Sequence, residues 1–213
     1  MLDEAATARA LDKLAAALPD GPGRDDALAL ARDAYVPGRT MRDAFARLLV
    51  ALVPDVVLMS ADDARLKRLG APLFAKEVRQ WGETLAALDT RSAELVAAGF
   101  HAQVAPSPVN LFVMGEGERL PLDPDDGGGF VPRGTGEVLS AEDLLARIEA
   151  APETISPNVV LRPLFQDVLL PTAAYVAGPG EAAYFAQLDP VYERFGVAMP
   201  VVAPRLGLTD RAR

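Results

Sequence analysis

The order of local signals in the last third of the chain constrains the fold most. Residues 173–176 form a short apolar run, residues 178–181 (Gly-Pro-Gly-Glu) form a tight turn, and an amphipathic stretch follows up to Gly196. A second apolar run covers residues 199–202. Strand, glycine turn, helix and strand in this order make a βαβ unit. Together with the apolar run at residues 56–59, which is typical of a buried parallel strand, this predicts an α/β fold.

The remaining segments fit around such a core. The chain has 213 residues, half of them hydrophobic, which suits one large domain or a core with a small appendage. We expect a helical segment over residues 1–53, a core over 54–205, and a tail over 206–213. Within the core, we expect a β-meander of hairpins at about residues 101–138, because short apolar runs alternate there with glycine-rich turns.

Several helix boundaries can also be predicted. Thr40 precedes Asp43, and Ser140 precedes Asp143, in the pattern of an N-cap pair. Residues 60–63 should cap a helix that ends at Gly70, and a separate long helix should start at Pro72 and stop at Gly99. Ser156 should cap a helix opened by Pro157.

Composition excludes several classes of function. The formal net charge is −9, which disfavours nucleic acid and anionic membrane surfaces as partners. The absence of cysteine excludes disulfides, a cysteine nucleophile and thiolate metal sites, and a single histidine, His101, excludes a zinc site rich in histidine. The acidic turn at residues 123–129 lacks the spacing of an EF-hand, so we expect no metal site. Without a long apolar run or a basic leader, the expected location is the cytoplasm.

The turn at residues 178–181 is the first candidate site. It lies between a predicted strand and a helix, where backbone N–H groups attract anions and where open α/β sheets bind ligands. Asn158, Arg162 and Gln166 are spaced four residues apart and should share one face of a helix, with Asp167 beside them. His101 and Gln103 should point to the same side of a strand. A purely structural role for each group remains the alternative.

Longer stretches of the chain resemble the bacillithiol biosynthesis cysteine-adding enzymes, the BshC family. The resemblance rests on residues 156–171 (SPNVVLRPLFQDVLLP), residues 174–184 (AYVAGPGEAAY) and the pair Gln187-Leu188. Shorter supporting stretches are residues 35–38, 66–72, 101–104, 110–112 and 199–205. The resemblance covers nearly the whole chain in order. The chain is similar to the C-terminal part of the family's core.

The resemblance implies a Rossmann-like parallel sheet, here partial, and formation of an amide between cysteine and glucosaminyl malate. It implies ATP or another nucleotide to activate the carboxyl group, as an acyl phosphate or an acyl adenylate. His101 and Glu181 would be catalytic. Substrate or nucleotide would be bound by residues on several elements: Gln103, Asn158, Arg162, Gln166, Asp167, Tyr175, Gly178, Pro179, Gly180, Tyr184 and Gln187.

Family members are more than twice as long and form homodimers through a C-terminal coiled coil. This chain lacks that coiled coil and the family's Thr-Gly-Gln-Gln loop, and Ala177 stands where a glycine is usual. It would be a truncated copy, a fragment, or one part of a split enzyme that needs a complementing N-terminal chain. Two alternatives stay open: an α/β protein resembling nucleotidyltransferases or glycosyltransferases, and a non-catalytic subunit that needs a partner chain.

Overall fold

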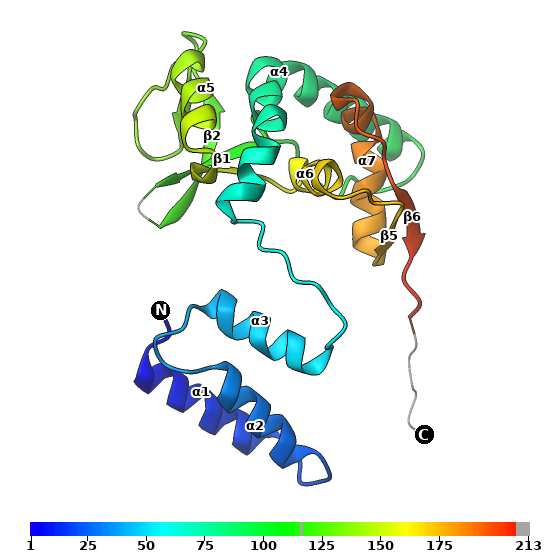
Figure 1. Cartoon of the computed structure of the whole chain (residues 1–213). Helices are drawn as coiled ribbons and strands as arrows, with labels where there is room; N and C mark the ends of the chain where they lie inside the picture. Colours follow the sequence, from blue (N-terminus) through cyan, green and yellow to red (C-terminus); the bar gives the residue numbers. More distant parts are fainter. Residues whose placement is uncertain (116, 208–213) are drawn as a thin grey trace. The chain divides into compact units, whose positions relative to one another are not determined.

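The computed structural model describes residues 1–115 and 117–207, which fall into two compact units, Met1–Ser60 (unit 1) and Ala61–Arg213 (unit 2). Unit 1 holds three helices (Figure 1): α1 (Glu4–Ala17), α2 (Arg24–Ala34) and α3 (Met41–Leu52). The predicted helical segment is therefore confirmed. The hydroxyl of Thr40 accepts a hydrogen bond of 3.0 Å from the Asp43 N–H and caps α3, as its position in the sequence indicates.

Unit 2 combines helices with two separate sheets. Its elements, in chain order, are α4 (Ala64–Ala97), β1 (Leu111–Gly115), β2 (Glu118–Pro124), β3 (Phe130–Pro132), α5 (Ala141–Ala150), η1 (Pro152–Thr154), β4 (Ile155–Pro157), α6 (Leu161–Leu169), β5 (Ala174–Ala177), α7 (Pro179–Phe195) and β6 (Val201–Pro204). Strands β3, β2, β1 and β4 form an antiparallel sheet in that order, which confirms a meander. Strands β5 and β6 pair in parallel.

The predicted βαβ unit is confirmed by the β5, α7 and β6 succession. Gly178 precedes α7, Pro179 takes its first position, and Gly196 ends it with φ at 69°. Proline at the first helical position and a left-handed glycine after the last are the usual helix boundaries. Figure 1 shows α7 beside the two strands that it connects.

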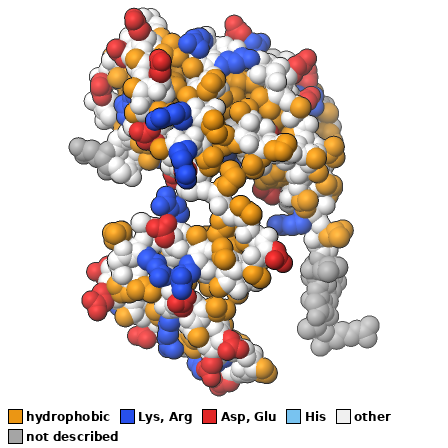
Figure 2. All heavy atoms as spheres, viewed as in Figure 1, with side chains coloured by type: hydrophobic (Ala, Val, Ile, Leu, Met, Phe, Trp, Pro, Cys, Tyr) orange, Lys and Arg blue, Asp and Glu red, His pale blue; other side chains and the backbone are white. Residues whose placement is uncertain are grey.

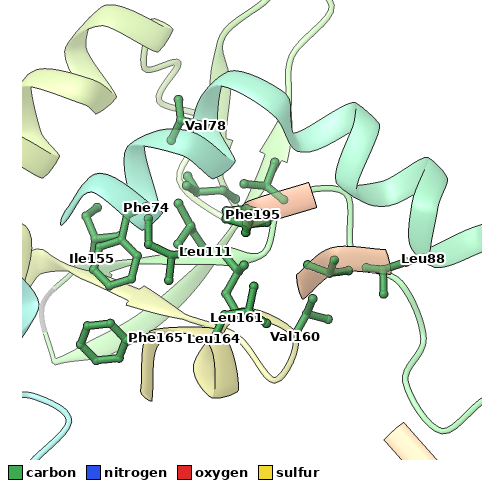
Figure 3. Packing of buried hydrophobic residues seen from close by; sticks show 14 of the residues in the cluster. Phe74, Val78, Leu88, Leu111, Ile155, Val160, Leu161, Leu164, Phe165 and Phe195 are labelled. Atoms are coloured by element: carbon green, nitrogen blue, oxygen red, sulfur yellow. The ribbon is translucent and has the colours of Figure 1, made fainter. Parts of the chain in front are cut away.

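One hydrophobic core holds unit 2 together. Helices α4, α5, α6 and α7 and strands β1, β2, β3 and β4 contribute buried side chains to it, several of which are labelled in Figure 3. The rings of Phe74 on α4 and Phe165 on α6 pack with centroids 5.4 Å apart. Gly70 allows this approach, because a Cβ atom there would lie 2.1 Å from Cε2 of Phe165. Burial of this apolar surface fixes α6 against α4.

The prediction of a buried strand at residues 56–59 is wrong. The segment lies outside any strand, and the side chain of Val57 is 91% exposed. A strand needs a ladder partner for its backbone N–H and C=O groups, and none of the described residues supplies one here.

The prediction of a strand at residues 100–104 is also wrong, so the meander begins at β1. The N–H groups of Gln103 and Val104 donate to Oε1 of Gln187, at 2.7 and 2.9 Å, instead of to a neighbouring strand. A buried side-chain amide thus takes the place of a strand edge.

Ser156 does not cap a helix, and Pro157 does not open one. Both belong to β4, which pairs antiparallel with β1 and delays the start of α6 to Leu161. The predicted break between Gly70 and Pro72 is wrong as well, because α4 continues through both residues and departs from helical geometry at Gln80. Burial of the α4 side chains against the core outweighs the local cost of proline.

The helix at residues 141–150 confirms the Ser140 and Asp143 cap, with a hydrogen bond of 3.0 Å from the Asp143 N–H to the Ser140 hydroxyl. Of the predicted tail, only Leu206 and Gly207 lie within the described residues. Over residues 1–115 and 117–207, no helix is both long enough and apolar enough to cross a membrane.

Candidate functional site

The carboxyl ends of the two parallel strands bring Gly178 and Arg205 together. Gly178 directly follows β5, and Arg205 directly follows β6, so parallel pairing puts both at one edge of the sheet. The Arg205 N–H donates to the Ala177 carbonyl at 2.7 Å. A Cβ atom at position 178 would lie 3.3 Å from Nη2 of Arg205, so glycine leaves room for the guanidinium group beside the backbone.

The carboxylate of Glu181 lies at the N-terminus of α7. Its Oε2 accepts a hydrogen bond of 3.0 Å from the Gly178 N–H, and its Oε1 accepts one of 2.9 Å from the Tyr175 hydroxyl. These two bonds, and then the charges of Arg205 and Arg162, hold the pKa of Glu181 below its ordinary value. Burial and the bond to Glu181 raise the pKa of Tyr175 to about 12. A negative charge is therefore stable at this turn.

Arg162 joins the same group of side chains from α6. Its Nη2 donates to the Tyr184 hydroxyl at 2.9 Å, while the residue itself stays exposed. We call the set of side chains at this edge the strand-end cluster: Arg162, Tyr175, Gly178, Glu181, Tyr184 and Arg205. Two guanidinium groups with a single carboxylate leave one formal positive charge, which favours an anionic ligand.

Asp167 lies deeper, on α6. The Tyr192 hydroxyl donates to its Oδ2 at 2.6 Å, and burial together with this bond raises the pKa of Tyr192. Its other oxygen, Oδ1, is buried and has no hydrogen-bond partner among the described residues. Asp167 is thus tied to the packing of α6 against α7.

Asn158 does not share a helix face with Arg162, because α6 begins only at Leu161. Its Oδ1 accepts from the Val160 N–H at 2.8 Å, and its Nδ2 donates to Oδ1 of Asn110 at 2.9 Å. Both ends of the Asn158 amide therefore hold the backbone in place just before α6 begins. Gln166 is half-buried on α6, and no side-chain hydrogen bond links it to the cluster within the described residues.

The remaining predicted residues lie on α7 and in the loop between α4 and β1. Gln187 on α7 is fully buried and holds the segment at residues 103–104, and Gln103 takes part through its backbone N–H. His101 is exposed in a loop, and in the described part of the chain no hydrogen bond or ion pair connects it to the cluster. Pro179 and Gly180 are exposed in the first turn of α7, where Pro179 has no N–H to offer.

Sequence reasoning missed Arg205 and Tyr192. The predicted domain bounds put Arg205 at the end of the core without a role, although a basic residue directly after a parallel strand is a usable signal for this edge. Tyr192 lies eight residues after Tyr184 on α7, and its pairing with Asp167 depends on how α6 packs. Among residues 1–115 and 117–207, no group of three or more histidine, cysteine, aspartate or glutamate side chains could hold a metal ion.

Comparison with known proteins now places the chain. A family model described as "Bacillithiol biosynthesis BshC, N-terminal Rossmann-like domain" matches residues 1–206. The chain belongs to this family. The expected resemblance to the BshC family is thereby confirmed, and the mixed α/β unit with its parallel pair is part of a Rossmann-like domain. Correspondence to the C-terminal part of the family's core stays a prediction.

Curated relatives agree and carry the name "Putative cysteine ligase BshC". The relative from Salinibacter ruber is 45% identical over 201 residues, which cover 93% of this chain and 37% of the relative. Those from Chloroherpeton thalassium and Koribacter versatilis are 36% and 43% identical and cover 91% and 84% of this chain. The chain spans only 34–37% of the length of these relatives.

Proposed function

We propose that this chain is one part of a ligase that joins the carboxyl group of cysteine to the amine of glucosaminyl malate. Family membership supports the reaction class, since the curated relatives are named as cysteine ligases. The observation that carries the site is the pairing of Arg162 and Arg205 with the glycine turn at the carboxyl ends of β5 and β6.

The substrates suit a positively charged edge. Malate carries carboxylates, and a nucleotide carries phosphates, and both kinds of group bind arginine through paired hydrogen bonds. In the proposal, Arg162 and Arg205 hold the anionic group, and the N–H groups of Gly180 and Glu181 in the first turn of α7 face it. Glu181 keeps the turn in shape through Gly178 and Tyr175.

Amide formation in water needs an activated carboxyl group. In the proposal, ATP supplies the activation, and the amine of glucosaminyl malate then displaces phosphate from an acyl phosphate or AMP from an acyl adenylate. The two routes differ in their products, ADP with phosphate against AMP with pyrophosphate, so the products identify the route. His101 and Glu181 remain the predicted candidates for proton transfer.

The proposal includes a second part of the enzyme, because the relatives extend well beyond the matched region. The test is a mass-spectrometric assay for the amide product with ATP, cysteine and glucosaminyl malate. The chain is assayed alone and together with the remainder of the Salinibacter ruber relative, supplied as a separate polypeptide. We expect product only with both parts, in the cytoplasm-like reducing conditions that keep cysteine a thiol.

Arg162→Ala should weaken substrate binding and raise KM, whereas Arg65→Ala should not. Arg65 is a suitable control because it is exposed on α4 and, among the described residues, its side chain bonds to Asp63 alone. Unchanged kinetics of Arg162→Ala would remove Arg162 from the site. Association of both parts without any product would favour the alternative of a non-catalytic subunit.

A further inference from the structure

One face of the parallel pair carries only apolar side chains, and no described residue of unit 2 covers it. Tyr175 and Val202 point toward α7, and the ring of Tyr175 packs 4.7 Å from that of Phe185. The opposite face carries Ala174, Val176, Val201 and Ala203. Val176 is 64% and Val201 is 69% exposed. Parallel sheets are normally covered on both faces, so this face is unfinished.

Figure 2 shows hydrophobic side chains among the exposed atoms over the part of unit 2 that holds β5 and β6. Two strands alone are also too few for a stable parallel sheet. Both features indicate that the sheet is extended by further elements, and the question is at which edge.

The outer edge of β6 is unsuited to another strand. The Val201 N–H donates to the carbonyl of Ala173, just before β5, and the N–H of Arg205, just after β6, donates to the Ala177 carbonyl, so odd-numbered residues of β6 face β5. Alternation then turns Pro200, Val202 and Pro204 outward. Two of these three residues are prolines without an N–H, a composition typical of a strand that ends a sheet.

The outer edge of β5 has the opposite character. Ala173, Tyr175 and Ala177 face β6, so Ala174 and Val176 direct their N–H and C=O groups away from it. Neither residue is a proline, and no described strand pairs with this edge. Strand addition through such free backbone groups is a common mode of recognition.

We propose that the outer edge of β5 binds a parallel β-strand, and the bare apolar face binds its attached apolar helix, both from the remainder of a BshC-family chain. The occupant follows from length and fold, because the family domain is Rossmann-like and the relatives are nearly three times as long as the matched region. β6 stays at the edge of the completed sheet. This inference rests on the proposed need for a second part, but not on the ligase reaction.

Backbone amide exchange of the full chain, followed by NMR, tests the edge. The probe is the remainder of the Salinibacter ruber relative, co-produced as a separate polypeptide. In the free chain, the Ala174 and Val176 amides should exchange quickly, while those of Tyr175 and Ala177 are protected by β6. With the probe, exchange at Ala174 and Val176 should slow by about tenfold or more, and that of Val202 should not change.

Two proline substitutions provide a matched pair. Val176→Pro removes an outward N–H from β5, and Val202→Pro removes one from β6, so neither breaks the ladder between the strands. Val176→Pro should raise the Kd for the probe by about tenfold or more, and Val202→Pro should leave it within about twofold. Protection of Tyr175 and Ala177 verifies that each variant keeps its sheet.

The inference is wrong if the Ala174 and Val176 amides are already protected in the free chain, if Val202 gains protection instead, or if the two parts do not associate. Exchange is measured without substrates, so its outcome is separate from activity. Protection at β5 without amide product would contradict only the proposed reaction. Product without protection at β5 would contradict only this inference.

Discussion

The Tyr175 hydroxyl donates a hydrogen bond of 2.9 Å to Oε1 of Glu181, and the second carboxylate oxygen of Glu181 accepts one from the Gly178 N–H at 3.0 Å. One carboxylate thereby ties strand β5 to the first turn of α7. It also places a negative charge where the helix dipole and two arginines favour one. The geometry of the strand-end cluster and the stability of the βαβ unit thus depend on the same side chain, that of Glu181.

Glu181→Gln should reduce the loss of stability in acid. The folded-state pKa of Glu181 lies below its ordinary 4.5, because Gly178 and Tyr175 donate to the charged form. The stabilisation is therefore complete above about pH 5 and is lost as the pH falls through the folded-state pKa. Urea unfolding between about pH 6 and pH 3 should show a steeper decline for the wild type than for Glu181→Gln.

Glu193→Gln is the control for this comparison, since Glu193 is exposed on the same helix and carries no hydrogen bond among the described side chains. Its acid profile should follow the wild type. Parallel profiles for the wild type and Glu181→Gln would show that the carboxylate does not secure the turn.

Gln187→Leu should destabilise unit 2 rather than weaken ligand binding. The Gln187 side chain accepts from two backbone N–H groups and donates to the Ser92 hydroxyl at 2.9 Å. Leucine would leave these groups unpaired, at a cost of about 2–4 kcal/mol in the free energy of unfolding. The fluorescence of Trp81, the single tryptophan and part of α4, reports the urea transition of this unit.

The matched variant Gln103→Leu should be nearly neutral, because Gln103 is exposed and takes part only through its backbone. If Gln187→Leu kept full stability and lost affinity for substrate, Gln187 would be a ligand residue after all.

Glu77→Gln should change the pH dependence of stability in the direction opposite to that of Glu181→Gln. Burial raises the pKa of Glu77, although its Oε1 accepts from the Asn110 N–H at 2.9 Å and the Asn110 amide at 2.8 Å. Above its ordinary 4.5, the folded state therefore binds more protons than the unfolded state, and stability falls as the pH rises through the folded-state pKa. The stability of Glu77→Gln relative to the wild type should increase over that interval.

Urea unfolding followed by Trp81 fluorescence measures this difference at each pH. Glu149→Gln, at an exposed position on α5, should show no such trend. Glu77→Ala should be less stable than Glu77→Gln by about 2–4 kcal/mol at every pH, because neither variant titrates at this position and alanine leaves the Asn110 donors unpaired. A constant difference between Glu77→Gln and the wild type would mean that Glu77 does not titrate in this range.

Sequence patterns predicted the parts of the fold that local chemistry specifies. The turn at residues 178–181, the N-caps at Thr40 and Ser140 and the βαβ order depend on residues close together in the chain. The strand predictions for residues 56–59 and 100–104 are wrong because a strand forms only with a partner, and distant segments determine which neighbours these residues have. For residues 103–104 that neighbour is the Gln187 side chain, more than 80 positions away.

The same reason limited the prediction of the site. Asn158 and Gln187 have residue types that suit ligand binding, and their spacing permits it. Their hydrogen bonds are instead taken up by Asn110 and by the backbone near Val104, which no local pattern reveals. Arg162 and Glu181 were found because charge and helix position are visible in the sequence itself.

Replacing two glycines on α4 by alanine should change the free energy of unfolding in opposite directions. A Cβ atom at Gly70 would lie 2.1 Å from Cε2 of Phe165, whose ring is buried and packs against Phe74. Gly70→Ala should therefore lower the free energy of unfolding by about 1–3 kcal/mol through overpacking. Gly82 is exposed on the same helix with nothing within 4 Å of the added atom, so Gly82→Ala should raise it by about 0.5–1 kcal/mol.

Urea unfolding followed by Trp81 fluorescence compares the two variants directly. The double variant Gly70→Ala with Phe165→Leu tests the cause, since removing the ring should make the alanine less costly than it is beside phenylalanine. Equal effects of Gly70→Ala in the presence and absence of the ring would refute the close approach of α4 and α6. Because α6 carries Arg162, this contact also determines where that guanidinium group stands relative to the turn at Gly178.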